Sequence, residues 1–287
     1  MPAPWSLCIL HQDGEMLVHR HMPAGPEPFL NAVAPYRTAR VVGVEGLFTG
    51  SWLADLCARA GIPFVRGHAL DRKAIHGGKA QNDTIAAPKI AVLLRGGMLP
   101  QAYVYPAAMR APRALLRRRM HLMRQRAELL AHLQHTNRQD HLPAIGQKIA
   151  DKAHRGGVAE RFPAPAVQQR IEGELALIGH DDALRRDVEL AIGRTAKHHN
   201  ANTRYLLRTV PGIGEILSLV LLYEIPDSQR CPRVQACVAY GRLVTCAQAS
   251  AGKRDGTSGT QSGNASLTWA FADAAVLCLR SHDAGQK

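Results

Sequence analysis

Along the first hundred residues, short apolar runs alternate with stretches whose apolar residues follow a helical period. Two strand-like runs, 6–10 and 15–19, flank the turn His11-Gln12-Asp13-Gly14, and together they predict a β-hairpin. Beyond it the pattern predicts a helix, a strand, a helix, a strand and a helix, at 27–36, 40–45, 51–60, 63–65 and 82–94. Elements in this order are typical of an α/β layer with a partly parallel sheet.

The middle of the chain has a different pattern. From residue 107 to about residue 139 it predicts one long helix with a stripe of leucines on one face. The segment 154–165, rich in Gly, Arg and Pro, predicts a break, and a second long helix follows from 166 to about 200. Two long helices with a connector predict an antiparallel hairpin between two end domains. The predicted divisions are 1–105, 106–200 and 201–287, of which the last is mainly helical.

Charge adds a class of partner to this picture. The 287 residues include 36 lysines and arginines against 23 acids, a formal net charge of +13. An excess of this size attracts polyanions; nucleic acid is the commonest, and an acidic membrane surface is the alternative. No apolar run approaches the roughly 20 residues of a membrane span, so we predict no membrane segment. The six cysteines show no Cys-x-x-Cys spacing, which indicates reduced thiols in a cytoplasmic protein.

Much of the positive charge lies in the first long helix, where seven arginines precede the first acid, Glu128. Arginines without acidic partners one turn away repel one another, and an anionic partner would relieve that repulsion. Phosphate contact and a solvated face of a bundle helix both remain open. The seven arginines are Arg110, Arg113, Arg117, Arg118, Arg119, Arg124 and Arg126.

A second candidate for phosphate contact is the turn Pro211-Gly212-Ile213-Gly214, which precedes an apolar helix at 215–223. Such a turn leaves backbone N–H groups free at the helix N-terminus, where they can hold a phosphate. Its glycines allow close approach of the backbone, as in helix-hairpin-helix modules that contact DNA without reading its sequence. A tight turn with a purely structural role is the alternative.

Two carboxylates and one hydroxyl are candidates for chemistry. Glu45 ends a predicted strand and Asp83 lies near a predicted helix start, positions from which nucleases hold magnesium ions through oxygen ligands. A solvated strand end and a helix cap are the alternatives for these two acids. Ser250 is a candidate nucleophile toward a phosphodiester, with Lys253 and Arg254 neutralising the developing charge. A flexible Ser/Gly loop is the alternative there.

Several landmarks fall in a fixed order along the chain, and that order resembles a known family. They are Val42-Gly43-Val44-Glu45, Trp52-Leu53, Lys79-Ala80-Gln81-Asn82-Asp83, Ile90-Ala91-Val92-Leu93-Leu94-Arg95-Gly96-Gly97, the basic helix, Val210-Pro211-Gly212-Ile213-Gly214, Ser250-Ala251-Gly252-Lys253 and Gly263-Asn264-Ala265-Ser266-Leu267. From about residue 6 to residue 280, this order and spacing resemble the transposases of the insertion-sequence-110 family, which are related to Piv-type DNA invertases.

The resemblance implies a ribonuclease-H-like (RuvC-like) N-terminal domain whose four acids, of Asp-Glu-Asp-Asp type, bind magnesium. It also implies a helical coiled coil in the middle and a C-terminal transposase domain with a serine nucleophile. Glu45 then matches the family's glutamate, Asp83 its third acid and Ser250 its serine. Family members cut and rejoin DNA as oligomers, which predicts a dimer or tetramer here, and some are guided by a structured RNA. The implied partners are DNA, a guide RNA and further copies of the chain, in a bacterial, nucleoid-associated setting.

Two positions depart from the family pattern. The family's first aspartate falls where this chain has Met1-Pro2-Ala3-Pro4, and Asp13 belongs to the hairpin turn instead. The fourth falls one helical turn after Asp83, where this chain has Ala86. Two carboxylates supply too little charge for tight magnesium binding, so we predict a degenerate or N-terminally altered copy with poor or absent strand transfer. Pro88 predicts a helix start near Ala86 or Ala87, which would leave Asp83 before the helix.

The sequence therefore leaves two main functions open. One is a DNA transposase or recombinase of an insertion sequence, and the alternative is a non-catalytic remnant that binds nucleic acid. Both predict binding that weakens with salt, but only the first predicts that Ser250→Ala abolishes cleavage and preserves binding. A structural coiled-coil protein is a third interpretation, which predicts weak binding with little salt dependence.

Overall fold

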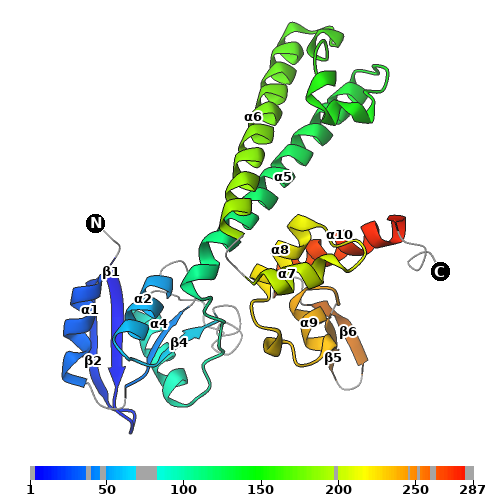
Figure 1. Ribbon diagram of the computed structural model, residues 1–287. Coiled ribbons are helices and arrows are strands. Elements are labelled where there is room, and N and C mark those ends of the chain that lie inside the picture. Colours follow the sequence, from blue (N-terminus) through cyan, green and yellow to red (C-terminus); the bar gives the residue numbers. More distant parts are fainter. Residues whose placement is uncertain are drawn as a thin grey trace. The chain divides into compact units, whose positions relative to one another are not determined.

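A computed structural model describes residues 4–36, 40–45, 50–68, 83–196, 200–244, 246–250, 253–258 and 263–281. These residues are mostly helical, and their strands form three two-stranded sheets. The chain divides into two compact units, Met1–Ala107 (unit 1) and Ala108–Lys287 (unit 2), which Figure 1 colours from blue to cyan and from green to red.

Unit 1 begins with the predicted hairpin. Strand β1 (Pro4–Leu10) pairs antiparallel with β2 (Met16–Pro23), with Trp5 opposite Met22 and Ser6 opposite His21. Gly14 in the turn has a φ of +97°, a conformation that glycine adopts without the strain of a Cβ. The hairpin predicted from the two apolar runs is confirmed.

The rest of unit 1 alternates helices with a parallel pair of strands, which confirms the predicted α/β layer. Strands β3 and β4 are parallel, with Glu45 opposite Gly67 at their ends, and they form a sheet separate from the hairpin. The side chains of Phe29, Leu53 and Cys57 form the core between the helices and strands. The elements are α1 (Pro26–Val33) with a 3₁₀ turn (Ala34–Tyr36), β3 (Val42–Glu45), α2 (Gly50–Arg59), β4 (Phe64–Gly67) and α4 (Asp83–Arg95).

Helix α4 begins within one residue of the start that the hydrophobic pattern predicted, and earlier than Pro88 predicted. Asp83 is its first residue and the helix continues through Pro88, so the prediction that Asp83 precedes the helix is wrong. Proline inside a helix removes one backbone hydrogen bond and costs about 3 kcal/mol. Packing offsets this cost, because α4 lies against β1 and β3. Leu94 approaches Gly43 so closely that a Cβ on that glycine would lie 2.9 Å from Leu94 Cδ2.

Unit 2 begins with the antiparallel helical hairpin of α5 (Ala107–Gln139) and α6 (Pro165–Ala196), which Figure 1 shows in green. The bounds predicted for the first helix are confirmed. The second is described to Ala196, and Asn200, near its predicted end, caps the next helix: the Asn200 side chain accepts a hydrogen bond of 3.2 Å from the Thr203 N–H. The connector between the two helices contains 3₁₀ turns at Gln147–Ala150, Lys152–His154 and Ala159–Arg161.

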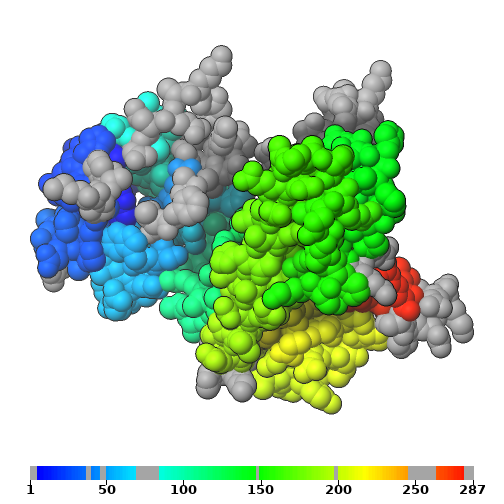
Figure 2. Space-filling view, turned by 90° about the horizontal axis from the view of Figure 1, so that it is seen from above, coloured from blue at the N-terminus to red at the C-terminus, as the bar shows by residue number. Residues whose placement is uncertain are grey.

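The C-terminal helices pack against the base of this helical hairpin. Every residue of α8 from Leu217 to Glu224 is buried, and Leu219 shares one core with Leu116 of α5, Ile192 of α6 and Leu267 of α10. The outer turns of α10 remain exposed, and Figure 2 shows them in red beside the yellow helices. The elements are α7 (Ala201–Arg208), α8 (Glu215–Glu224), a 3₁₀ turn (Ser228–Arg230), α9 (Val234–Tyr240), β5 (Cys246–Ser250), β6 (Lys253–Ser258) and α10 (Ala265–Ser281).

None of the helices in the described part of the chain combines the length and the apolar character that crossing a membrane requires.

Candidate functional site

One end of unit 1 brings together the end of β3, the start of α2 and the start of β1. Gly50, the first residue of α2, lies beside Val44, since a Cβ on the glycine would be 3.4 Å from Val44 Cγ1. Two residues further on, Trp52 stacks on Trp5 of β1 with ring centroids 5.0 Å apart. Aromatic packing therefore fixes the first turn of α2 against the beginning of the hairpin.

The start of α4 lies at this same end. Thr84, the second residue of α4, has its Oγ1 3.0 Å from Nε2 of His21, and His21 is opposite Ser6 of β1. The backbones of Glu45 and Asp83, the two acids predicted as metal ligands, are thus both placed near the beginning of β1. Glu45 is half-buried, and the side chain of Asp83 lies outside the described residues.

The remaining positions of the family's acidic pattern supply no carboxylate here. Ala86 lies one turn after Asp83 on α4, and a methyl group offers no oxygen to a metal ion. Asp13 lies in the turn at the opposite end of the hairpin, where its Oδ2 is 2.9 Å from Nδ1 of His11. In the described ranges, no three His, Cys, Asp or Glu side chains gather as a metal site. Among the described side chains Glu45 is then the one acid of this pattern, and a single carboxylate does not fit a magnesium ion.

In unit 2, two arginines of α5 converge on one buried carboxylate. Arg113 Nε donates to Glu224 Oε2 at 2.9 Å, and Arg117 Nε donates to Glu224 Oε1 at 2.8 Å. Burial by itself would raise the pKa of Glu224, whose side chain is only 2% exposed. The two guanidinium groups and the amide of Asn264 outweigh that effect and lower the pKa of Glu224 below its usual value, so the carboxylate is kept charged.

Two further arginines of α5 pair with acids of α6. Arg119 Nε lies 2.7 Å from Glu189 Oε1, and Arg126 Nε lies 2.7 Å from Asp182 Oδ1. Arg155 from the connector also reaches Asp182, with Nη2 2.6 Å from Oδ2. Burial acts to raise the pKa of Asp182, but hydrogen bonds and charge from Arg155 and Arg126 lower it overall.

These contacts correct the interpretation of the arginine-rich helix. The acidic partners lie 56 to 111 residues away along the chain, so the spacing of charges within the helix could not reveal them. Unrelieved repulsion therefore gives no reason to assign Arg113 and Arg117 to phosphate contact, because both are engaged with Glu224. Arg118 and Arg124 are exposed, and none of the described acids lies in ion-pair range of either. Arg110 is half-buried.

The turn before α8 packs tightly on α10. Gly212 has a φ of +85°, and a Cβ there would lie 2.3 Å from the carbonyl oxygen of Ala274. Gly212 thus permits close contact between two protein segments, which is the structural role left open by the sequence. Gly214 differs, because it caps α8 and a Cβ there would meet nothing within 4 Å.

Two arginines missed in the sequence lie beside this turn. Arg204 and Arg208, one turn apart on α7, both pair with Glu215, the first residue of α8; the Arg208 Nη1 to Glu215 Oε2 distance is 3.3 Å. Their i, i+4 spacing next to the Pro-Gly turn was the available signal. They place positive charge at the N-terminus of α8, where the helix dipole also favours an anion.

The segment that carries Ser250 is a β-hairpin. Strand β5 ends at Ser250, β6 begins at Lys253, and these two residues are opposite one another in the antiparallel register. Ala249 is opposite Arg254. The alternative of a loop without regular structure is therefore wrong for 246–250 and 253–258. The side chains of Ser250, Lys253 and Arg254 lie outside the described residues.

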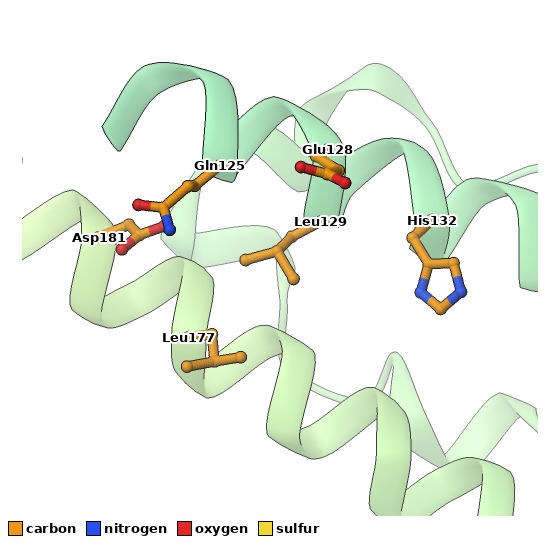
Figure 3. Close-up of a pocket in the computed structure, with 6 residues that line it drawn as sticks. All are labelled: Gln125, Glu128, Leu129, His132, Leu177 and Asp181. Carbon is orange, nitrogen blue, oxygen red and sulfur yellow. The ribbon is translucent and has the colours of Figure 1, made fainter. Parts of the chain in front are cut away.

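A pocket of about 330 Å³ between α5 and α6 contains none of these candidates. In Figure 3, Gln125 of α5 and Asp181 of α6 point toward one another, and Leu129 extends from α5 toward the side of Leu177. The pocket is lined by Gln125, Glu128, Leu129, His132, Leu177 and Asp181. It lies along the helical hairpin and adds no residue to the candidate site.

Comparison with known proteins assigns the C-terminal part of the chain. No curated protein matches the sequence. Residues 204–287 match the family described as Transposase IS116/IS110/IS902 family, and this range covers most of α7, the turn, α8, the Ser250 hairpin and α10. Residues 204–287 thus carry the transposase signature of the IS116/IS110/IS902 family, and within this range the resemblance predicted from the sequence is confirmed.

Proposed function

We propose that this chain is an insertion-sequence transposase that cuts and rejoins DNA strands, with Ser250 as the nucleophile. The observation that carries the proposal is the transposase match over residues 204–287, which contains the whole β5–β6 hairpin. The position of Ser250 at a strand end, opposite a lysine, supports it, because a nucleophile for a phosphodiester needs positive charge beside it.

The chemistry is a phosphoryl transfer in two steps. Ser250 Oγ attacks the phosphorus, the bond from phosphorus to one deoxyribose oxygen breaks, the seryl proton leaves, and the departing oxygen takes up a proton. The DNA end is then joined to the serine as a phosphodiester and is not hydrolysed, so the strand can be rejoined without a further source of energy. In the second step a sugar hydroxyl from another strand attacks the same phosphorus and releases the serine.

Lys253 and Arg254 are the cations we assign to this phosphate. Lys253 is opposite Ser250 in the antiparallel register and Arg254 is the next residue, so both cations belong to the same end of the hairpin as the serine. Positive charge there stabilises the charge that develops on the phosphate oxygens in the transition state.

We assign the DNA backbone to the exposed arginines of α5 and to the N-terminus of α8. Arg118 and Arg124 are exposed and outside ion-pair range of every described acid. Pro211 and Gly214 border the N-terminus of α8, where Arg204 and Arg208 are paired with Glu215. The net charge of +13 supports a polyanionic partner. A structured guide RNA would present the same phosphates, and we keep it as a proposed second partner.

For unit 1 we propose a RuvC-like domain, supported by the parallel strands β3 and β4, the helix α2 between them and an acid at the end of β3. Together with a coiled-coil α5–α6 hairpin, this gives the three parts 1–105, 106–200 and 201–287, which we propose to assemble as a dimer or tetramer. Because Ala86 replaces a carboxylate, we propose impaired activity, and a non-catalytic remnant that binds nucleic acid is the second candidate function.

The variant Ala86→Asp tests the impairment. A carboxylate one turn after Asp83 adds a hard oxygen ligand at the same end of unit 1, so magnesium affinity measured by calorimetry is expected to rise. Ala87→Asp is the matched control, because it adds the same charge on a different face of α4. Equal magnesium affinity in both variants, or recombination by the unaltered chain at rates typical of the family, would contradict the proposal.

Ser250→Ala tests the proposed function. Cleavage of DNA from the element's ends is expected to disappear, while the dissociation constant for the same DNA is retained. Ser258→Ala in β6 is the control, because Ser258 is opposite Cys246 and not opposite a cation, and it should cleave like the unaltered chain. Full cleavage by Ser250→Ala would exclude Ser250 as the nucleophile, whereas DNA binding without cleavage by the unaltered chain would favour the remnant.

A further inference from the structure

The Ser250 hairpin is closed at its base by contacts between the two segments that flank it. The N–H of Asn264 donates to the carbonyl oxygen of Tyr240 at 2.7 Å, and Thr268 Oγ1 donates to the carbonyl oxygen of Gly241 at 2.8 Å. The chain therefore leaves α9 and returns to α10 at one point. Whatever fixes that point also fixes the position from which the hairpin extends.

Gly263 makes this close approach possible. It has a φ of +111°, and a Cβ there would lie 2.7 Å from the carbonyl oxygen of Tyr240. A residue with a side chain would be strained in this conformation and would also push the two segments apart. Gly263 and the asparagine after it thus hold the two flanking segments together at the base of the hairpin.

Asn264 connects this base to the interior of unit 2. Its Nδ2 donates to Glu224 Oε2 at 2.7 Å, and its Oδ1 accepts from the N–H of Ser266 at 3.0 Å in the first turn of α10. The residue is 5% exposed. One side chain therefore caps α10 and links it to α8, and both of its polar atoms are satisfied.

Glu224, the partner of Asn264, also contacts α5. The same carboxylate receives the hydrogen bonds of Arg113 and Arg117, and the next residue on α5 is Arg118, which we assigned to DNA. A buried ion pair is weak evidence for stability, because an apolar cluster of similar volume often serves as well. The hydrogen bonds of Glu224 are directional, so they restrict the orientation of α5, α8 and α10 as well as the distances between them.

We propose that Asn264 and Glu224 are positioning residues, which fix the base of the Ser250 hairpin relative to α5 so that the nucleophile meets DNA bound on that helix. The proposal rests on the function proposed above, because it takes Ser250 as the nucleophile. A small displacement of a reacting group is costly: about 1 Å can reduce a rate roughly 100-fold.

Asn264→Ser separates the link from the helix cap. Serine is a good N-cap and keeps an oxygen for the first turn of α10, but it is too short to donate to Glu224. Asn264→Asp is the second variant: it keeps the shape and the cap, removes the donor and adds a like charge. Glu189→Gln is the matched control, because it weakens an ion pair of α5 that has no connection to the hairpin.

The full-length variants are compared by amide hydrogen exchange, by DNA affinity and by cleavage rate. In both Asn264 variants we expect faster exchange in 246–258 with unchanged exchange in α6. Cleavage is expected to fall about 10- to 100-fold while DNA affinity is retained, a separation that general destabilisation would not give. Glu189→Gln is expected to match the unaltered chain in all three measurements.

Unchanged exchange in 246–258 in both Asn264 variants would overturn the proposal, and so would faster exchange with an unchanged cleavage rate. Parallel losses of affinity and cleavage would also overturn it, because they indicate general damage. If Ser250→Ala still cleaves, or the unaltered chain cleaves nothing, the proposed function fails. The exchange comparison then still decides whether the link holds the hairpin.

Discussion

At the scale of single residues, Glu224 shows how unit 2 keeps a charge in its interior. An isolated carboxylate in such a place would lose its proton only at raised pH, because burial disfavours the charged form. Arg113, Arg117 and Asn264 reverse this by donating hydrogen bonds to both oxygens. Arg126 and Arg155 likewise donate hydrogen bonds to Asp182 and favour its charged form. Stability and charge are therefore coupled at two positions of unit 2.

The coupling predicts a loss of stability in acid. Both carboxyl groups have folded pKa values below their unfolded values of about 4.3 for Glu and 3.9 for Asp, so their contribution is complete above that range. It is lost as the pH falls through the folded pKa values. Urea denaturation followed between pH 6 and pH 3 should show the free energy of unfolding falling from about pH 4.3 downward.

The variants Glu224→Gln and Asp182→Asn provide the comparison for this prediction. Each removes one titrating group, so each should have a shallower decline of unfolding free energy in acid than the unaltered chain. If both variants and the unaltered chain had the same slope, the two carboxylates would not be the linked groups.

At the scale of elements, the sequence predicted what depends on local pattern. The first long helix was placed at its observed bounds because its leucine stripe is continuous, and the hairpin turn was found because Asp13-Gly14 is a turn signal. The apolar pattern also predicts α4 at close to its observed bounds, whereas the local rule for Pro88 predicts too late a start, because packing against β1 and β3 stabilises the first turn. The strands of the Ser250 hairpin are not predicted by local pattern, because 246–258 is rich in Ala, Gly and Ser and poor in the β-branched and aromatic residues typical of strands.

Helix α8 and its turn give a prediction on stability. Gly212→Ala should lower the free energy of unfolding by about 2–4 kcal/mol, because the new Cβ would strain a positive φ and meet the Ala274 carbonyl oxygen. Gly214→Ala, in the same turn with open space around it, should cost less than about 1 kcal/mol. Urea denaturation measures both. Equal costs would show that the turn is not held against α10.

Helix α5 gives a prediction on binding. Replacing Arg118 and Arg124 together by alanine should reduce the slope of log K against log salt by about 0.9 for each phosphate that the helix no longer neutralises. Arg119→Ala is the control, because that guanidinium is engaged with Glu189 and should leave the slope unchanged. Titration of duplex DNA at several salt concentrations checks this. Equal slopes in all three proteins would exclude the exposed face of α5 as the surface that binds DNA.

At the scale of the whole molecule, the contacts on which our proposals rest join residues far apart in the sequence. The pairs from α5 to Glu224 span 107 and 111 residues, and the bond from Asn264 to Glu224 spans 40. Spacing rules cannot show such partners, so the sequence pairs neither the arginines of α5 with their acids nor Glu224, at the end of an apolar helix, with Asn264. The order of landmarks, by contrast, was visible in the sequence and led to the transposase family.

The most direct measurement of the central claim is the identity of the residue that becomes joined to DNA. The full-length protein is incubated with DNA from its element's ends, denatured, digested with nuclease and protease, and the peptide that carries a nucleotide is mapped by mass spectrometry. We predict a phosphoserine ester at Ser250, with no such peptide from Ser250→Ala. Attachment at any other residue, or DNA cleavage with no protein–DNA adduct, would contradict the account.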